Sequence, residues 1–548
     1  MAKAFINRGI LDADEVREFL NPRLSDLHDP ETLPDIAKAA ERVRRAALAN
    51  QKVVVYGDYD VDGVSGAALL VQFLKLLNMD VAYYVPHRIR EGYGLNANAI
   101  REFTSSDVQL LITVDCGINA VDEIDKANES GIDIIITDHH EPGAEVPRAY
   151  AITNPKLAGS KYPFRHLSGA GVALKLVWAI AQKLSPGRRV KPEFREFLMD
   201  ALGLAALGTI ADVVPLIGEN RVLAKFGLEA LAVSRSPGVR ALIESAGLDG
   251  YRLASHHVSY RLAPRLNAAG RMAEAKMCVE LLTTDSTEKA RQIAKKLDEN
   301  NRWRQQIQRD VLQSVRERLS KEVDLNNDLV VVLADEYWHA GVLGIVASKV
   351  VDDHYRPTVL VALDDGIGKG SGRSIPEFNL FDALAECGRP LISFGGHSQA
   401  AGIKIKYEDI DAFRGALNAY ASQKLDVRNL VCSLDIDAEI EADDLTVDLV
   451  GAMGRMAPYG EGNREPVFCT RGLRVAGAPR LIGKEDRHLA FYVRQGASSF
   501  RAIAFGMADL YDAILAAEYC DLAYKAKINE RNGRRAVELE VVDIQMRG

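Results

Sequence analysis

The stretch VVVYGDYDVDG, residues 53–63, joins a β-branched apolar run to three alternating aspartates and a glycine. The aspartates match positions 1, 3 and 5 of a calcium-binding EF-hand loop, but Leu69 stands at position 12, where that loop needs a glutamate. An EF-hand loop also follows a helix, whereas residues 52–56 have the composition of a buried strand. The stretch therefore predicts a strand that ends in a group of carboxylates.

Acidic residues follow two further apolar runs in the same way. Asp115 directly follows LLITV at 110–114, and the triplet DHH at 138–140 directly follows IDIIIT at 132–137. Helical segments lie between these runs, an arrangement typical of βαβ units and a parallel sheet. Because parallel strands end at one edge of a sheet, we expect these carboxylates to converge there.

Length and composition limit the kind of protein. A chain of 548 residues is too long for one hydrophobic core, so about three domains are expected. The N-terminal segment lacks the features of a signal peptide, and charges interrupt the longest apolar stretches. Six scattered cysteines without a CxxC pair suggest neither a zinc ribbon nor a disulfide framework. We expect a non-exported, cytoplasmic protein that does not contact a membrane.

The pattern along the chain predicts four segments. Residues 1–282 would form the parallel-sheet catalytic domain with an N-terminal extension, and residues 283–325, without Gly or Pro, predict a long connecting helix. Residues 326–427 hold a second, smaller α/β domain with the glycine-rich segments GKGSGRSI and FGGHSQAAG. Residues 428–548 show short alternating strands and a tight turn at Asn532-Gly533, which favours an OB-like β-barrel over another small β fold. The predicted fold class is therefore α/β multidomain with a C-terminal β-barrel.

The residues expected at the sheet edge are typical of a metal site. They are Asp58, Asp60, Asp62, Asp115, Asp138, His139, His140 and, from a later helical region, Asp212. Carboxylates with one or two imidazoles suit Mn²⁺ or Mg²⁺ better than a structural zinc, and so many negative charges need cations nearby. A single aspartate would be interpreted as a helix cap, but three strands that end in this way favour two divalent ions. Paired ions indicate phosphoester hydrolysis.

Several motifs carry a family resemblance. The segments VVVYGDYDVDG, TVDCG, ITDHH and TIADVVPL closely resemble the four motifs of the DHH phosphoesterase superfamily, and GSGRS and FGGHSQAAG resemble its DHHA1 domain. REGYGL (90–95), PRLNAAGRM (264–272) and PYGEGNREPVF (458–468) are similar to segments of single-strand-specific exonucleases in this superfamily. The resemblance covers almost the whole chain. It implies a metal-dependent enzyme that removes mononucleotides from the 5′ end of single-stranded DNA during recombination and repair.

The resemblance also implies roles for individual residues. Asp60 and Asp115 would hold one ion, assisted by Asp58. Asp62, Asp115, His139 and Asp212 would hold the other, with Asp115 bridging the two. His140 would act beside the scissile phosphate, and Asp138 would orient the histidines. Tyr56 stands where pyrophosphatases of the superfamily have a histidine, so the second site would rely on carboxylates.

Substrate contacts are expected in the second α/β domain. By resemblance, Ser371, Arg373, Gly395, Gly396 and His397 would face the metals across a cleft, and the arginine would clamp a phosphate. From the residues alone, a flexible hairpin at GKGSGRS and a plain turn at Gly395-Gly396 explain these segments equally well. The pair His256-His257 follows no strand and is expected to be structural.

Two other functions stay open at this point. A DHH phosphodiesterase acting on short oligonucleotides or cyclic dinucleotides would be shorter and would need neither the long helix nor the C-terminal domain. A non-catalytic DNA-binding or replisome scaffold would be expected to have lost metal ligands, all of which are present here. The expected partner is single-stranded DNA with a 5′ end; a single-strand-binding protein and a helicase are candidate protein partners, and a monomer is expected.

Overall fold

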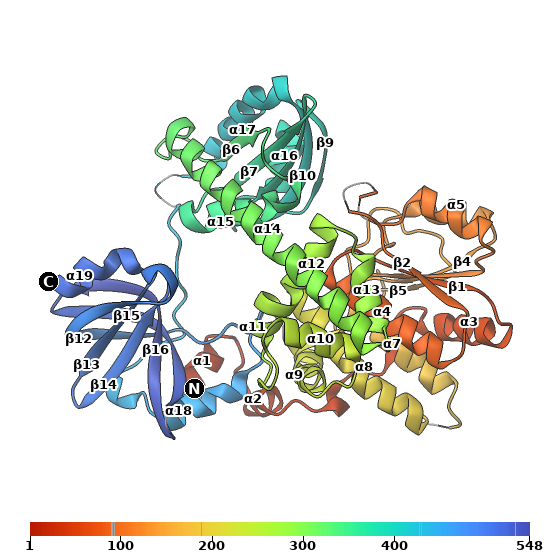
Figure 1. Cartoon of the computed structure of the whole chain (residues 1–548), viewed down its shortest axis with the longest axis horizontal. Coiled ribbons are helices and arrows are strands. Elements are labelled where there is room, and N and C mark those ends of the chain that lie inside the picture. Colours follow the sequence, from red (N-terminus) through yellow and green to blue (C-terminus); the bar gives the residue numbers. More distant parts are fainter. Residues whose placement is uncertain are drawn as a thin grey trace.

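The computed structural model describes residues 1–547 except 89, 90, 93, 188, 427, 429 and 532. It contains three β-sheets, and Figure 1 shows two α/β units joined by a long helix with a β-barrel to one side. The predicted α/β multidomain fold with a C-terminal barrel is confirmed. Among the described residues, every helix is too short or too polar to cross a membrane.

The first sheet has five parallel strands in the order β2-β1-β3-β4-β5. Its apolar runs are buried on both faces: Val53 and Val55 pack into one hydrophobic cluster, Val54 and Tyr56 into another. This two-sided burial explains why the strands are continuously apolar rather than alternating. The strands are β1 (Val53–Gly57), β2 (Val81–Tyr84), β3 (Leu110–Val114), β4 (Asp133–Thr137) and the short β5 (Ala151–Thr153).

Helices cover the sheet and continue into a helical subdomain. The α3, α4 and α7 helices cover one face, whereas residues of α5 and α6 pack on the other. The helices before the connecting helix are α1 (Ala2–Ile6), α2 (Ala13–Leu20), α3 (Ile36–Leu48), α4 (Val61–Leu76), α5 (Ala97–Ser105), α6 (Val121–Glu129), α7 (Gly169–Lys183), α8 (Pro192–Ala211), α9 (Gly218–Ala232), α10 (Pro237–Ser245), α11 (Ser255–His257), α12 (Ala263–Met272) and α13 (Lys276–Thr283).

The predicted connecting helix is α14 (Thr287–Glu322), which has 36 residues and a length of about 54 Å. It begins at an N-cap in which the Ser286 side chain accepts a hydrogen bond from the Lys289 amide. It packs on α10, α12 and α13 in the first unit and on α15 and β6 in the second (Figure 1). One stiff element thus joins the two α/β units.

The second sheet has the order β6-β7-β8-β10-β9. The glycine-rich segment GKGSGRS lies mainly in β8, which forms a hairpin with β7 and also pairs with β10, so the segment is a hairpin arm held on both sides and not a flexible one. The elements are β6 (Val331–Asp335), α15 (Leu343–His354), β7 (Thr358–Asp364), β8 (Ile367–Arg373), α16 (Leu380–Cys387), β9 (Leu391–Gly396), β10 (Ala400–Lys406) and α17 (Ile410–Lys424).

The third sheet closes into a five-stranded barrel because β12 pairs with both β13 and β15. The predicted turn includes Asn532, which lies outside the described residues, as do Arg90 and Tyr93 of the REGYGL segment. The elements are β11 (Ala438–Glu439), α18 (Val447–Met453), β12 (Phe468–Ile482), β13 (His488–Gln495), β14 (Ser498–Ala504), α19 (Tyr511–Ala516), β15 (Tyr519–Arg531) and β16 (Arg534–Arg547).

Candidate metal centre

Three strands of the first sheet end level with one another. Gly57 of β1 is in register with Val114 of β3, which is in register with Thr137 of β4. The next residue of each strand is an aspartate: Asp58, Asp115 and Asp138 respectively. The sheet register alone therefore places three carboxylates side by side at one edge, as the sequence predicts.

Two further aspartates belong to the start of α4. Asp60 is the N-cap of this helix, and its Oδ1 accepts hydrogen bonds from the amides of Asp62 and Gly63. One oxygen of Asp60 therefore caps the helix, as expected for a single aspartate at a strand end. The other oxygen can still bind a metal, so the two roles are compatible. Asp62 is buried, and its two oxygens accept hydrogen bonds from the Gly169 and Ala170 amides at the start of α7.

His139 lies between carboxylates that come from different elements. Its Nε2 is 3.0 Å from Asp115 Oδ1, 3.5 Å from Asp212 Oδ2 and 3.9 Å from Asp62 Oδ2. Asp212 reaches this point because α8 ends there, with Asp212 as its C-cap. Residues separated by up to 150 positions thus surround one imidazole nitrogen.

Asp138 is bonded to the histidine pair and not to the other carboxylates. Its Oδ1 accepts hydrogen bonds from the His139 and His140 amides and lies 2.8 Å from His140 Nδ1, while Oδ2 accepts from the Ile118 amide. Hydrogen bonding to these donors lowers the pKa of Asp138 despite its burial. This geometry fixes the orientation of the His140 ring.

Among the described residues, three groups of side chains have ligand atoms close enough to share a cation. They are Asp58, Asp60 and Asp115; Asp62, His139 and Asp212; and Asp115, His139 and His140, each within 4.8 Å. The first two groups have the composition of the two predicted ion sites, and Asp115 lies beside His139 of the second. We call Asp58, Asp60, Asp62, Asp115, His139 and Asp212 the acidic cluster.

The protonation behaviour of the acidic cluster fits a cation site. Burial and neighbouring carboxylates raise the pKa of Asp62 to about 7 and that of Asp212 to about 9, and also raise the pKa of Asp58 and Asp115. Burial lowers the pKa of His139 to about 3, so its imidazole is neutral, as a metal ligand must be. The buried Asp58 Oδ1 accepts no hydrogen bond from any described residue. Divalent cations would compensate these charges.

Tyr56 takes no part in the acidic cluster. Its ring is buried on the opposite face of β1, where it stacks on Tyr84, and its hydroxyl donates to the Gly94 carbonyl. The tyrosine at this position is therefore a packing residue.

The predicted substrate-binding residues occupy one end of the second sheet. Ser371 and Arg373 lie on β8, and Arg373 Nη1 donates to Ser371 Oγ at 3.2 Å and to the Gly372 carbonyl. The edge strand β9 ends with Gly395 and Gly396, and His397 follows directly. We call these three exposed residues the glycine-rich edge. No described contact joins the glycine-rich edge to the acidic cluster.

An arginine cluster that sequence reasoning missed connects the two α/β units. Burial, together with the nearby positive charges of Arg88, Arg304 and Arg373, lowers the pKa of Arg271 to about 9. Arg271 Nη1 also donates to the Gly341 carbonyl of the second unit. Arg271 lies in the segment PRLNAAGRM, so the family resemblance of this segment was the feature of the sequence that could have indicated its role. Four guanidinium groups with mutual repulsion indicate a site for an anion such as a phosphate.

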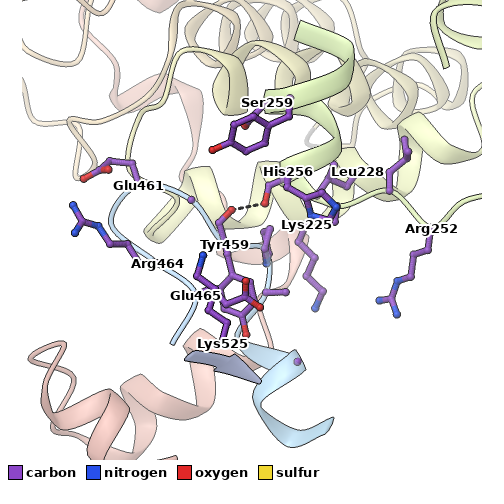
Figure 2. Close-up of a pocket in the computed structure, with 18 of the residues that line it drawn as sticks. Lys225, Leu228, Arg252, His256, Ser259, Tyr459, Glu461, Arg464, Glu465 and Lys525 are labelled. Carbon is purple, nitrogen blue, oxygen red and sulfur yellow. Dashed lines mark hydrogen bonds between the residues drawn. The ribbon is translucent and has the colours of Figure 1, made fainter. Parts of the chain in front are cut away.

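A cleft of about 1550 Å³ lies between the first α/β unit and the barrel (Figure 2). Its lining includes Ala211 and Val213, the two chain neighbours of Asp212. Its basic lining residues outnumber the acidic ones and include Lys225, Arg252, Arg455, Arg464, Lys525 and Lys527. His256 also lines this interdomain cleft, a position that sequence reasoning missed. His257 is structural, as expected, because its Nδ1 accepts a hydrogen bond from the Ala254 amide.

Comparison with known families agrees with these features. Residues 52–209 match the DHH family, N-terminal domain; residues 326–423 match the DHHA1 domain; and residues 436–543 match the RecJ OB domain. The three matches follow one another in the same order as the three sheets.

Individual relatives match over the whole chain. The chain is 37% identical to the single-stranded-DNA-specific exonuclease RecJ of Bacillus subtilis, over 99% of this chain and 67% of that protein. It is 32% identical to the protein of the same name from Escherichia coli, over 99% of this chain and 95% of that protein. The crystal structure of Thermus thermophilus RecJ with Mn²⁺ superimposes with a TM-score of 0.83 at 32% identity, covering 100% of this chain and 76% of that one.

Proposed function

The chain belongs to the RecJ family of single-stranded-DNA-specific exonucleases, and on this premise we propose that it removes mononucleotides from the 5′ end of single-stranded DNA with two divalent ions, Mn²⁺ or Mg²⁺. The observation that carries the proposal is the acidic cluster, because four buried carboxylate or imidazole side chains, Asp58, Asp62, Asp115 and His139, share one sheet edge. Such a set favours hydrolysis of a phosphodiester.

In the proposed mechanism the protein holds the ions and orients the phosphate. Asp58, Asp60 and Asp115 would hold one ion, and Asp62, Asp115, His139 and Asp212 the other. Two ions bound there would supply an activated water and neutralise the charge that develops on the phosphate. The hydrogen bonds from the start of α7 hold Asp62 in place, so the ligand geometry exists before substrate binds.

The histidine pair divides two tasks in this proposal. His139 is neutral and presents Nε2 as a ligand atom. Asp138 bonds to Nδ1 of His140, and this contact raises the pKa of His140 despite its burial, which favours the protonated imidazole. We assign to His140 a hydrogen bond to the scissile phosphate and to Asp138 the orientation of that ring.

The arginine cluster supports recognition of a terminal phosphate. It lies where the two α/β units meet, next to Ser371, which accepts a hydrogen bond from Arg373. A phosphate bound by Arg271 and Arg373 would hold the end of the strand between the two α/β units, so the metals would cut near a strand terminus and not within a strand. The glycine-rich edge would let the phosphate backbone come close. We propose that this terminus is the 5′ end.

The interdomain cleft supports a single strand as the substrate. It runs from the chain neighbours of Asp212 to the barrel, and its basic lining would give a path for the rest of the strand. A phosphodiesterase for cyclic or very short substrates has no use for such a path, and a scaffold has no use for intact ligands. Because one chain supplies both α/β units, we propose a monomer that acts in the cytoplasm on strands opened by a helicase and covered by a single-strand-binding protein.

End-labelled oligonucleotides test this proposal. The purified protein with Mn²⁺ should release a 5′ label first, as a mononucleotide, and leave duplex DNA intact. Chelation or the Asp62→Ala substitution should abolish release, whereas Asp122→Ala, which changes an exposed aspartate of α6, should not. Earlier release of a 3′ label would contradict the polarity, and activity with excess chelator would contradict the metal mechanism.

A further inference from the structure

The motif PYGEGNREPVF lies at the junction between the first α/β unit and the barrel. Residues 454–464, which we call the interdomain strap, join α18 to the segment before β12. One side of the strap lines the interdomain cleft through Tyr459, Glu461 and Arg464 (Figure 2). The position of the strap therefore decides how far one wall of the cleft lies from the acidic cluster.

Arg221 of α9 is the main contact of the strap with the catalytic unit. Its Nη1 donates to the carbonyls of Met456 and Pro458, at 2.8 and 3.4 Å, and its Nη2 to those of Arg455 and Ala457, at 3.3 and 2.9 Å. Its Nε donates to the Phe19 carbonyl, and the Phe19 ring covers the guanidinium at 3.9 Å. Only 2% of the residue is exposed.

The hydrogen bonds of Arg221 require the strap to follow one particular backbone path. All of them are backbone carbonyls, and four come from consecutive residues of the strap. One planar guanidinium can satisfy them only while the strap keeps this backbone path. A lysine, with a single ammonium group, cannot reach the same set.

Neighbouring contacts hold the strap to the same segment of the catalytic unit. The Leu216 amide donates to the Glu461 carbonyl at 2.7 Å, and the Ser255 hydroxyl donates to the Tyr459 carbonyl. The strap approaches so closely that a Cβ added at Gly460 would lie 2.6 Å from the Leu216 side chain. Two of the contact residues, Leu216 and Arg221, fall within nine residues after Asp212, so the strap is attached close to a member of the acidic cluster.

We propose that Arg221 is a positioning residue that fixes the strap, and with it the barrel side of the cleft, at a set distance from the metal centre. A strand held by the barrel then enters the acidic cluster with its scissile phosphate in the position for cleavage. Arg221 would thus govern binding of long strands and leave the hydrolytic step unchanged. This inference rests on the proposed exonuclease function.

The test compares substrates of two lengths in the full chain. Steady-state kcat and KM are measured with Mn²⁺ for a 5′-phosphorylated strand of about four nucleotides and one of about 30 nucleotides, so that only the longer one reaches the barrel. For Arg221→Lys we expect KM for the long strand to rise on the order of tenfold, because the second binding module loses its fixed distance. The kcat for both strands, and KM for the short one, should stay within about twofold.

A matched control separates positioning from general loss of stability. Arg42 of α3 is also buried, at 5% exposure, and bonds to Asp133, Gln51 and the Gln109 carbonyl, behind the first sheet and away from the strap. Arg42→Lys should lower the melting temperature and leave the length dependence unaltered. If both variants change the two substrates alike, Arg221 is merely structural and the proposal is overturned.

Small-angle scattering gives a readout that does not depend on activity. Arg221→Lys should increase the radius of gyration, because the barrel is released from the catalytic unit, and Arg42→Lys should not. An unchanged radius would overturn the proposal even if the wild-type protein proved inactive on DNA, an outcome that would contradict the proposed function alone. If Arg221→Lys fails to fold, Asn463→Ala takes its place, because Asn463 Nδ2 donates to the same Met456 and Pro458 carbonyls.

Discussion

The acidic cluster is mostly buried and held by hydrogen bonds, whereas the glycine-rich edge, which we propose faces the substrate, is open to solvent. Asp62 has both oxygens bonded to amides of α7, while Gly395 has no atom within 4 Å of the place that a Cβ would occupy. The difference teaches that the protein fixes the groups that perform the chemistry before the substrate arrives. The groups that contact the substrate keep space for it. Substitutions in the first region should change kcat, and those in the second should change KM.

The largest expected effect is at the centre of the acidic cluster. Asp115→Asn should reduce kcat on the order of 10³-fold, about 4 kcal/mol of transition-state stabilisation, since Asp115 lies in two of the three potential ion groups. Single-turnover rates on a 5′-labelled strand measure the loss, with Asp122→Asn as the control. If this variant keeps its kcat but binds DNA weakly, the expectation that the acidic cluster governs kcat and the glycine-rich edge governs KM is wrong.

A smaller effect is expected from the arginine cluster. Arg271→Lys should lower kcat/KM by about 10- to 100-fold, the value of one or two charge-assisted hydrogen bonds. The loss should be greater for a 5′-phosphorylated strand than for one with a 5′-hydroxyl. Arg265→Lys, on the same helix but paired with Asp298, is the control. Equal losses on the two kinds of strand would rule out recognition of the terminal phosphate.

Two adjacent glycines sharpen the comparison further. Gly395→Ala should leave stability unchanged and raise KM about three- to tenfold, because its methyl group enters space kept for the substrate. Gly396 has a φ of +145°, and a Cβ there would lie 2.4 Å from the Ala400 carbonyl oxygen. Gly396→Ala should therefore lower the free energy of unfolding by about 1–3 kcal/mol. Thermal melts and steady-state kinetics on both variants distinguish the two outcomes.

The smallest effect concerns the pH dependence of stability without metal. The pKa of Asp62 is about 7 in the fold against an ordinary value of 3.8, so the folded protein binds more protons than the unfolded chain between these values. The contribution of Asp62 to stability is present below pH 3.8 and is lost as the pH rises through 7. In chelator, the melting temperature should fall by a few degrees from pH 5 to pH 8, and Mn²⁺ should raise it most at pH 8. A metal-free melting temperature that rises over this interval would contradict the assigned repulsion.

The sequence predicts much of the acidic cluster because Asp58 and Asp115 directly follow apolar strands, and parallel strands end together. It predicts α14 for a similar reason, since a run without Gly or Pro admits little else. Arg271 and Arg221 carry no such local signal. Each of these arginines makes its contacts across a boundary between units, which the sequence does not show. Each also lies on a helix, where many residue types would fit the local pattern equally well. The role of His256 depends in the same way on a barrel that lies some 200 residues later in the chain.

The length of α14 has a mechanical consequence. A helix of 36 residues bends only gently and does not stretch, so the two α/β units can change their distance mainly by turning about its ends. It therefore acts as a lever: a rotation of about 5° at one end moves the other by about 5 Å over its length of about 54 Å. A small tilt where α14 packs on α10 would thus move Arg373 of the second unit toward or away from the acidic cluster of the first unit by about the span of one phosphate group.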